Sequence, residues 1–260
     1  MELIDIGINL MHNRYHSDRD KVIANAIESN VKKMIITGTT LWNSKSALIR
    51  AKKHPNILYS TLGVHPHNAR DFSDETIKEF RTLGKEKEVV AIGECGLDFD
   101  RDFSPREAQK ICFEEHLKLA CELELPVFLH ERESFKDFII ILEKYKNKLK
   151  NSVVHCFTGN KEELEKYIEL DLYIGITGAV LDERRSHLKE IIKLIPSNRL
   201  MIETDGPFLL PKSLKKLSST RRNEPAFLVP IAKEIAFYLD KTYDELVNIT
   251  TKNAKDFFNI

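Results

Sequence analysis

The alternation of apolar and helical segments is the feature that most narrows the fold of this 260-residue chain. Short runs rich in β-branched residues alternate with longer stretches of helical period, and the alternation repeats eight times. This rhythm is typical of βα units that build a parallel sheet. The predicted strands are Leu3–Ile8, Met34–Thr37, Ile57–Leu62, Val89–Ile92, Val127–Leu129, Val153–Val154, Tyr173–Ile176 and Leu200–Ile202.

The segments between these strands predict helices. Three helices should begin near a serine N-cap, at Ser17-Asp18, Ser73-Asp74 and Ser104-Pro105, where the proline would be the first helical residue. On the helix after Ser104, the expected apolar face is Ile111, Phe113, Leu117 and Cys121. The later predicted helices are Phe135–Lys148, Lys161–Leu170, Arg185–Leu194, Ala226–Leu239 and Asp244–Phe258.

The number of βα units favours a closed barrel over an open sheet. α/β barrels commonly reach about 250 residues as one domain, and no linker or composition shift interrupts this chain. An open doubly wound sheet would usually have a glycine-rich first turn, whereas Gly7-Ile8-Asn9-Leu10 is not a GxGxxG motif. We therefore expect an α/β fold, a TIM (β/α)8 barrel, with residues 1–260 forming a single domain.

The amino-acid composition indicates which binding partners and which cellular compartment to expect. Lys plus Arg equal Asp plus Glu at 40 each, so nucleic-acid binding would need a local basic surface. The four cysteines form no CxxC pair, as expected for reduced thiols in a cytosolic protein. No stretch approaches the roughly 20 apolar residues of a membrane span. We expect a cytoplasmic monomer without a membrane partner.

Polar residues follow the predicted strands in an unusual set. In chain order they are Asn9, Thr39, His65, His67, Glu94, His130, His155, Thr177 and Asp205. Barrel enzymes place reactive side chains at the carboxyl ends of their strands, so these residues would converge on one mouth. A single histidine there is often only a hydrogen-bonded structural residue, but several imidazoles and carboxylates together favour a divalent-metal site.

Six motifs along the chain carry a family resemblance. They are Gly63-Val64-His65-Pro66-His67, Gly93-Glu94-Cys95-Gly96-Leu97-Asp98-Phe99, Phe128-Leu129-His130, His155-Cys156-Phe157-Thr158-Gly159, Glu203-Thr204-Asp205-Gly206-Pro207 and Arg222-Asn223-Glu224-Pro225. Together they resemble the motif series of the TatD family of metal-dependent deoxyribonucleases. The resemblance implies an amidohydrolase-like TIM barrel, dependence on a divalent metal, and 3′–5′ exonuclease or related DNase activity.

The resemblance also implies roles for individual residues. Glu94, His130 and His155 match the family's metal ligands, and Asp205 matches the aspartate that binds metal or handles the attacking water. Glu94 and Asp205 are thus the predicted catalytic residues. Most family members carry His-x-His after the first strand, whereas this chain has Gly7 and Asn9 there, like the branch that contains bacterial TatD. With fewer imidazoles and hard oxygen ligands, the expected ion is Mg²⁺, with Mn²⁺ as the alternative.

A basic segment indicates the substrate class. Between Lys212 and Asn223 the chain has five basic residues and no acidic one, just after the eighth strand, where barrels often bind phosphate. The alternative is a solvated basic loop. Trp42 is expected to be buried against the second helix, whereas Phe208 is a candidate for stacking on a base. The predicted substrate-binding residues are His65, Arg101, Arg132, Arg222 and Asn223.

These features together predict a metal-dependent nuclease, a 3′–5′ exonuclease acting on single-stranded DNA, with RNA as a further substrate. One alternative is a metal-dependent amidohydrolase or esterase acting on a small molecule or an aminoacyl ester. Another is a non-catalytic binding barrel, which would neither bind Mg²⁺ nor turn over any substrate. Fold alone does not separate these functions.

Overall fold

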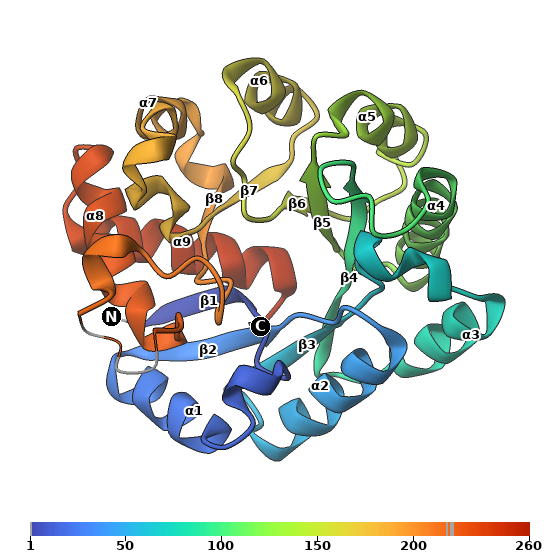
Figure 1. Cartoon of the computed structure of the whole chain (residues 1–260), viewed down its shortest axis with the longest axis horizontal. Coiled ribbons are helices and arrows are strands. Elements are labelled where there is room, and N and C mark those ends of the chain that lie inside the picture. The colour runs from blue at the N-terminus through green and yellow to red at the C-terminus, as the bar shows by residue number, and fades with distance from the viewer. Residues whose placement is uncertain (1, 217, 219–220) are drawn as a thin grey trace. The chain divides into compact units, whose positions relative to one another are not determined.

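The computed structural model describes residues 2–216, 218 and 221–260 (Figure 1). The chain divides into two compact units. Unit 1 is formed by Met1–Ile36 and Cys156–Ile260, and unit 2 by Thr37–His155. The metal-ligand residues that the sequence predicts are therefore distributed over both units, with Asp205 in unit 1 and the others in unit 2.

Unit 1 is built on four strands, which are β1 (Leu3–Ile8), β2 (Val31–Ile36), β7 (Tyr173–Ile176) and β8 (Leu200–Ile202). β1 pairs in parallel with β2, and β7 with β8. A parallel bridge between Ile8 and Gly206 connects the end of β1 to the segment after β8. The helices of this unit are α1 (Arg19–Glu28), α6 (Lys161–Glu169), α7 (His187–Ile191), α8 (Leu228–Tyr238) and α9 (Tyr243–Phe258).

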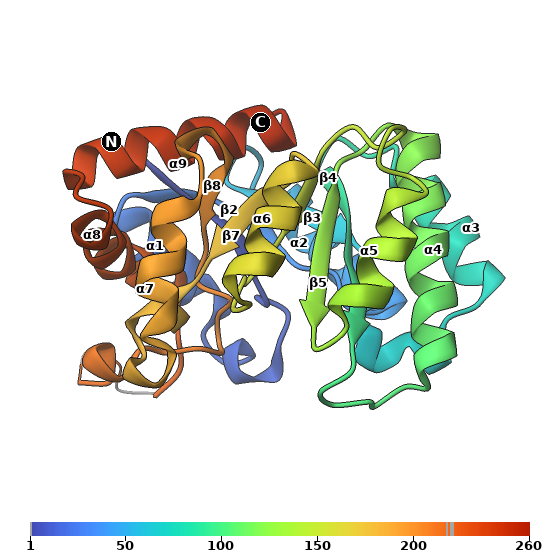
Figure 2. The same cartoon turned by 90° about the horizontal axis from the view of Figure 1, so that it is seen from above.

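Helix α9 closes one side of unit 1. It packs against β1 and β8, and its buried face includes Leu246, Phe257 and Phe258. Figure 2 shows α9 beside β8. Its start is specified locally, because Thr242 and Glu245 form a capping box in which each side chain bonds the other residue's backbone N–H. The sequence prediction for this helix is correct to within one residue.

Unit 2 contains the other four strands, β3 (Leu58–Leu62), β4 (Val89–Asp98), β5 (Val127–Arg132) and β6 (Ser152–Val154), paired in parallel in this order. Its helices are α2 (Leu41–Lys53), α3 (Asp74–Leu83), α4 (Arg106–Leu123) and α5 (Phe135–Glu143). Helices α3, α4 and α5 lie side by side in Figure 2. Phe113 of α4 stacks on Phe138 of α5 at 5.1 Å between ring centroids, in the core between these helices.

Strands β4 and β5 are longer than predicted, and the difference affects the site. Gly93 and Gly96 suggest a strand end, but β4 runs on to Asp98, and β5 runs on to Arg132. Both glycines have positive φ angles (138° and 143°), and a Cβ atom on either would lie about 2 Å from a carbonyl oxygen of β5. Glycine therefore permits this close pairing of β4 with β5, and Glu94 and His130 lie within strands rather than after them.

Several predicted helix details are wrong. Helix α4 begins at Arg106 with Pro105 at its N-cap, and Ser104 instead donates its hydroxyl to the His67 carbonyl. Ile111, expected on the apolar face of α4, is exposed, because the buried face runs through Gln109, Phe113 and His116. The helix predicted over Phe135–Lys148 ends at Glu143, and the one predicted over Arg185–Leu194 is broken into α7 and flanking 3₁₀ turns.

Composition predicts unpaired cysteines and no membrane-spanning segment. The four cysteines are all free thiols, as expected. None of the helices in the described part of the chain is long and apolar enough to cross a membrane.

Candidate metal centre

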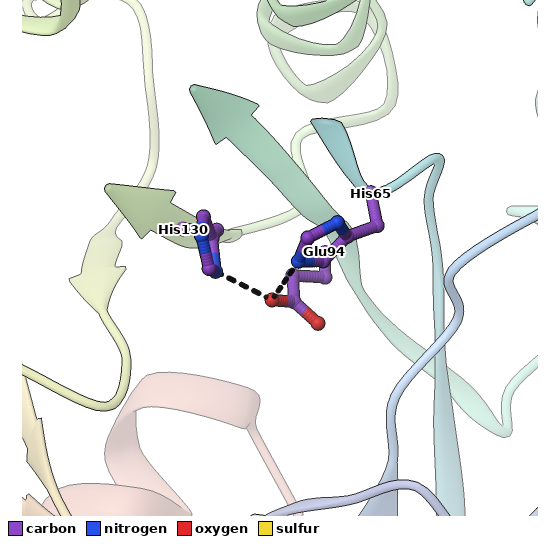
Figure 3. A group of neighbouring side chains, drawn as sticks. All are labelled: His65, Glu94 and His130. Atoms are coloured by element: carbon purple, nitrogen blue, oxygen red, sulfur yellow. Dashed lines mark hydrogen bonds and ion pairs between the residues drawn. The ribbon is translucent and has the colours of Figure 1, made fainter. Parts of the chain in front are cut away.

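The carboxylate of Glu94 lies at the centre of a group of histidines in unit 2. Its Oε1 atom is 2.9 Å from His130 Nδ1, 2.8 Å from His155 Nε2 and 3.3 Å from His65 Nε2. Figure 3 shows the His65 and His130 rings turned toward this oxygen. Glu94 and His155 are buried, and the other two side chains are mostly so. We call these four residues the Glu94 cluster.

Backbone pairing brings the members of the Glu94 cluster together. His130 on β5 pairs with Gly96 of β4, two residues beyond Glu94. His155 directly follows β6, and its N–H donates to the Leu129 carbonyl at 2.9 Å. His65 follows β3, and its N–H donates to the Thr39 carbonyl at 3.0 Å. Parallel pairing thus brings side chains of β4 and β5, and of the segments after β3 and β6, to a single oxygen atom.

Asp98 joins this site, although sequence reasoning missed it. It is buried at the end of β4, where its Oδ2 atom is 2.8 Å from His67 Nε2 and 3.3 Å from His130 Nε2. The available signal was its place in the motif Gly93-Glu94-Cys95-Gly96-Leu97-Asp98-Phe99, which also carries Glu94. His130 consequently has a carboxylate at each of its ring nitrogens.

Burial and charge pairing act against each other in this site. Burial alone would raise the pKa of Glu94, but the nearby His155 and His65 and the bonds from the imidazoles hold it well below its ordinary value. Burial lowers the pKa of His65 to about 4. For His130, hydrogen bonds to Asp98 and Glu94 outweigh burial and raise the pKa. The site therefore presents a charged carboxylate in a buried setting.

The donor set of the cluster fits a divalent ion. Three members, His65, Glu94 and His130, have ligand atoms that all lie within 4.8 Å of one another. An octahedral ion with bonds of about 2.1 Å holds neighbouring ligand atoms about 3 Å apart, close to the observed nitrogen-to-oxygen distances. A metal-binding imidazole commonly gives its second nitrogen to a carboxylate, and Asp98 stands in that place for His130. His65, predicted as a substrate contact, thus lies among the candidate ligands.

Asp205 lies in unit 1 at the turn after β8. Its backbone has a positive φ of 52°, and its N–H donates to the Gly7 carbonyl at 2.9 Å. The Asn9 side-chain amide donates to Asp205 Oδ1 at 2.8 Å. Asn9, the residue directly after β1, thus orients the Asp205 carboxylate through a hydrogen bond.

Arg222 and Asn223, which are predicted substrate contacts, are both buried. The Arg222 guanidinium is buried, donates to both carboxylate oxygens of Asp18, and lies over the Tyr15 ring. Asn223 is also buried, and its side-chain amide donates to the Thr204 carbonyl at 2.8 Å. Both side chains are therefore engaged inside unit 1, and their contact with substrate stays a prediction.

The remaining predicted contacts are exposed side chains. Arg132 forms an ion pair of 3.0 Å with Asp100, and Arg101 approaches the same carboxylate at 3.6 Å. The basic segment between Lys212 and Asn223 includes residues 217, 219 and 220, which lie outside the described residues. Trp42 is 71 % exposed at the start of α2, so its predicted burial is wrong. The physical reason is that α2 turns Ala47, Leu48 and Ala51 inward instead.

A buried carboxyl beside the Asp205 turn gives a test of pH-dependent stability. Asp5 on β1 accepts hydrogen bonds from the backbone N–H and the hydroxyl of Thr204, and burial raises its pKa to about 7 from an unfolded value near 3.8. Between these values the folded protein keeps a proton that the unfolded chain has lost. Asp5 should therefore lower the free energy of unfolding by up to about 1.4 kcal/mol per pH unit as the pH rises from 4 to 7.

Urea unfolding of wild type and Asp5→Asn between pH 4.5 and 7.5 measures this contribution. In Asp5→Asn, the free energy of unfolding should no longer fall with pH by this amount. Asp240→Asn, a substitution on the surface, should keep the wild-type dependence on pH. Parallel curves for wild type and Asp5→Asn would show that Asp5 ionises alike in both states.

The fold, together with its match to solved structures, defines a class of protein. The strands follow one another in chain order, β1 to β8, and solved barrels match the chain along its length. One is a TatD homologue from Escherichia coli, with a TM-score of 0.91, 26 % identity and coverage of 99 % of this chain and 98 % of that one. Another is an amidohydrolase from Saccharomyces cerevisiae, with a TM-score of 0.88, 25 % identity and coverage of 99 % and 100 %. The predicted TIM barrel of the amidohydrolase-like hydrolases is confirmed.

Sequence comparison then gives the family. The model of the TatD-related DNase family matches residues 4–259. A relative from Erwinia tasmaniensis named "3'-5' ssDNA/RNA exonuclease TatD" is 48 % identical, over 99 % of this chain and 100 % of the relative. A protein of the same name from Salmonella typhimurium is 40 % identical, with 99 % of each chain covered. The chain belongs to the TatD-related DNase family, as its motifs predict. Its organisation as a single domain stays a prediction.

Proposed function

We propose that this protein is a divalent-metal-dependent nuclease that removes nucleotides from the 3′ end of single-stranded DNA, and that it also degrades RNA. The observation that carries the proposal is the buried Glu94 carboxylate with imidazole nitrogens at 2.8–3.3 Å, in a chain of the TatD-related DNase family. The names of the curated relatives supply the direction and the substrates.

In this proposal Glu94, His130 and His155 hold the ion, with His65 either as a further ligand or in contact with a phosphate oxygen. A bound Mg²⁺ or Mn²⁺ would neutralise charge on the phosphate and make water a better nucleophile. Mg²⁺ is the proposed physiological ion and Mn²⁺ the alternative. The Glu94 carboxylate suits either ion, whereas the imidazole nitrogens are softer donors, which Mg²⁺ binds less readily than oxygen.

Asp205 is the proposed general base. A carboxylate that removes a proton from the attacking water must keep one oxygen directed at that water. The hydrogen bond from Asn9 to Oδ1 restrains the rotation of this carboxylate, which supports such a role. Its place after β8 and its match to the family motif are the further support.

Arg101 and Arg132 are the proposed phosphate contacts. Both are exposed on the segments that follow Glu94 and His130 along β4 and β5, and both share Asp100 as a counter-ion. A substrate phosphate would replace Asp100 as their partner. Contacts of this kind bind the nucleic-acid backbone without recognising its base sequence.

The protein is further proposed to act as a cytoplasmic monomer.

The test is a degradation assay with metal-stripped protein and a 5′-labelled single-stranded oligonucleotide. Adding Mg²⁺ or Mn²⁺ should restore a ladder that shortens from the 3′ end, and Zn²⁺ serves as the comparison ion. Raising salt from 50 to 200 mM should raise KM several-fold if cationic side chains hold the backbone. A folded protein that cleaves nothing with any of the three metals would overturn the proposal and favour a small-molecule amidohydrolase.

A further inference from the structure

Phe103 is an exposed aromatic residue on the loop between β4 and α4. Its side chain is 52 % exposed, whereas the next residue, Ser104, is completely buried. Burying a phenylalanine is worth about 2 kcal/mol, so core packing does not explain a ring held at the surface. Isolated exposed apolar residues are common on protein surfaces, so the surroundings of Phe103 decide whether the ring has a role.

The loop that carries Phe103 is fixed on both sides by buried hydrogen bonds. The buried Gln109 side chain accepts from the Asp98 N–H at 2.8 Å and donates to the carbonyls of Asp98 (3.1 Å) and Ser104 (2.9 Å). The Ser104 hydroxyl donates to the His67 carbonyl at 2.8 Å. The backbone on either side of Phe103 is therefore held in place, which reduces the conformational entropy lost when a ligand binds there.

A series of rings connects Phe103 to the Glu94 cluster. The Phe103 ring meets the His67 ring edge-on at 4.8 Å between centroids, and His67 lies 4.2 Å from His65. His65 in turn lies 4.5 Å from His130. The exposed ring is thus two rings away from an imidazole whose nitrogen contacts Glu94. A nucleotide whose phosphate lies at the Glu94 cluster would have its base within reach of Phe103.

We propose that Phe103 is a base-stacking residue that binds a nucleobase next to the scissile phosphate. The inference rests on the proposed nuclease function and names a subsite for it. The charged side chains of the same loop are suited to the phosphate backbone, whereas the face of the Phe103 ring, which meets His67 only edge-on, is suited to a flat base. Stacking on a phenyl ring tolerates every base, and it would give affinity for single strands without sequence preference.

The experiment compares two oligonucleotides of equal length, one normal and one with abasic residues at its last three 3′ positions. The readout is the ratio of kcat/KM between them, for wild type, Phe103→Ala, Phe103→Leu and Phe103→Trp. Wild type and Phe103→Trp should favour the normal strand by about 10-fold, and the alanine and leucine variants should reduce the ratio close to one. Phe237→Ala, which removes an exposed ring from α8, should keep the wild-type ratio.

A ratio that stays at the wild-type value in Phe103→Ala would overturn the stacking role, even if both rates fall, because a structural effect lowers both alike. The same ratio measured as Kd by fluorescence anisotropy in EDTA keeps the two proposals separate. If wild type degrades neither strand, the nuclease function fails, while the Kd ratio still decides whether Phe103 binds a base.

Discussion

Glu94→Gln should lower kcat on single-stranded DNA by about 10³-fold or more while leaving the fold intact. The Glu94 Oε1 atom is the common contact of His65, His130 and His155, and the amide would replace its charge with a neutral group. Without that charge, the cluster should also bind Mn²⁺ at least about 100-fold more weakly. Steady-state kinetics and isothermal titration with Mn²⁺ measure the two effects.

Glu122→Gln is the matched control for this variant. It makes the same chemical change in a carboxylate that forms an exposed ion pair with Arg81, and it should keep wild-type kinetics and metal affinity. Circular dichroism and thermal unfolding should show both variants folded. Near-wild-type turnover by Glu94→Gln would exclude the Glu94 cluster as the reaction centre.

Asp205→Asn should lower kcat by about 10²- to 10⁴-fold, the usual contribution of a general base, with a smaller change in KM. The substitution is nearly isosteric, and its carbonyl oxygen can still accept the hydrogen bond that Asn9 gives to Oδ1. The turn after β8 should therefore be preserved, so that the loss reports on proton transfer rather than on folding. Single-turnover rates as a function of pH measure it.

A general base leaves a further signature. The wild-type rate should rise with pH through one ionisation and then level off, and that ionisation should be absent from the residual rate of Asp205→Asn. Asp240→Asn, at the surface after α8, is the control and should keep the wild-type profile. An unchanged pH profile in Asp205→Asn would assign proton removal to another group.

The local sequence patterns are sufficient to predict the architecture of the chain. Eight apolar runs separated by helical stretches predict a βα barrel, and β1, β7 and β8 have the predicted bounds. Strand and helix periodicities are local properties that each segment carries by itself. The motifs around Glu94 and Asp205 were likewise sufficient to predict the family.

The length of β4 and the exposure of individual side chains could not be predicted from the neighbouring residues in the sequence. Gly93 and Gly96 look like a strand end, yet they extend the strand because β5 approaches too closely for a Cβ atom. Trp42 is exposed and Arg222 buried, against expectation from their types. Burial depends on which face a helix or loop turns inward, and that is decided by neighbours far away in sequence.

The order of the βα units, the residue types near the strand ends and the family all follow from the amino-acid sequence. Three features arise only on folding: His65 and His155 share an oxygen of Glu94, Asp98 supports His130, and Phe103 is held outside the core. They could not be predicted because the residues involved are far apart along the chain. His65 and His155 are 90 residues apart, and only parallel pairing of β3 to β6 brings their rings to one atom.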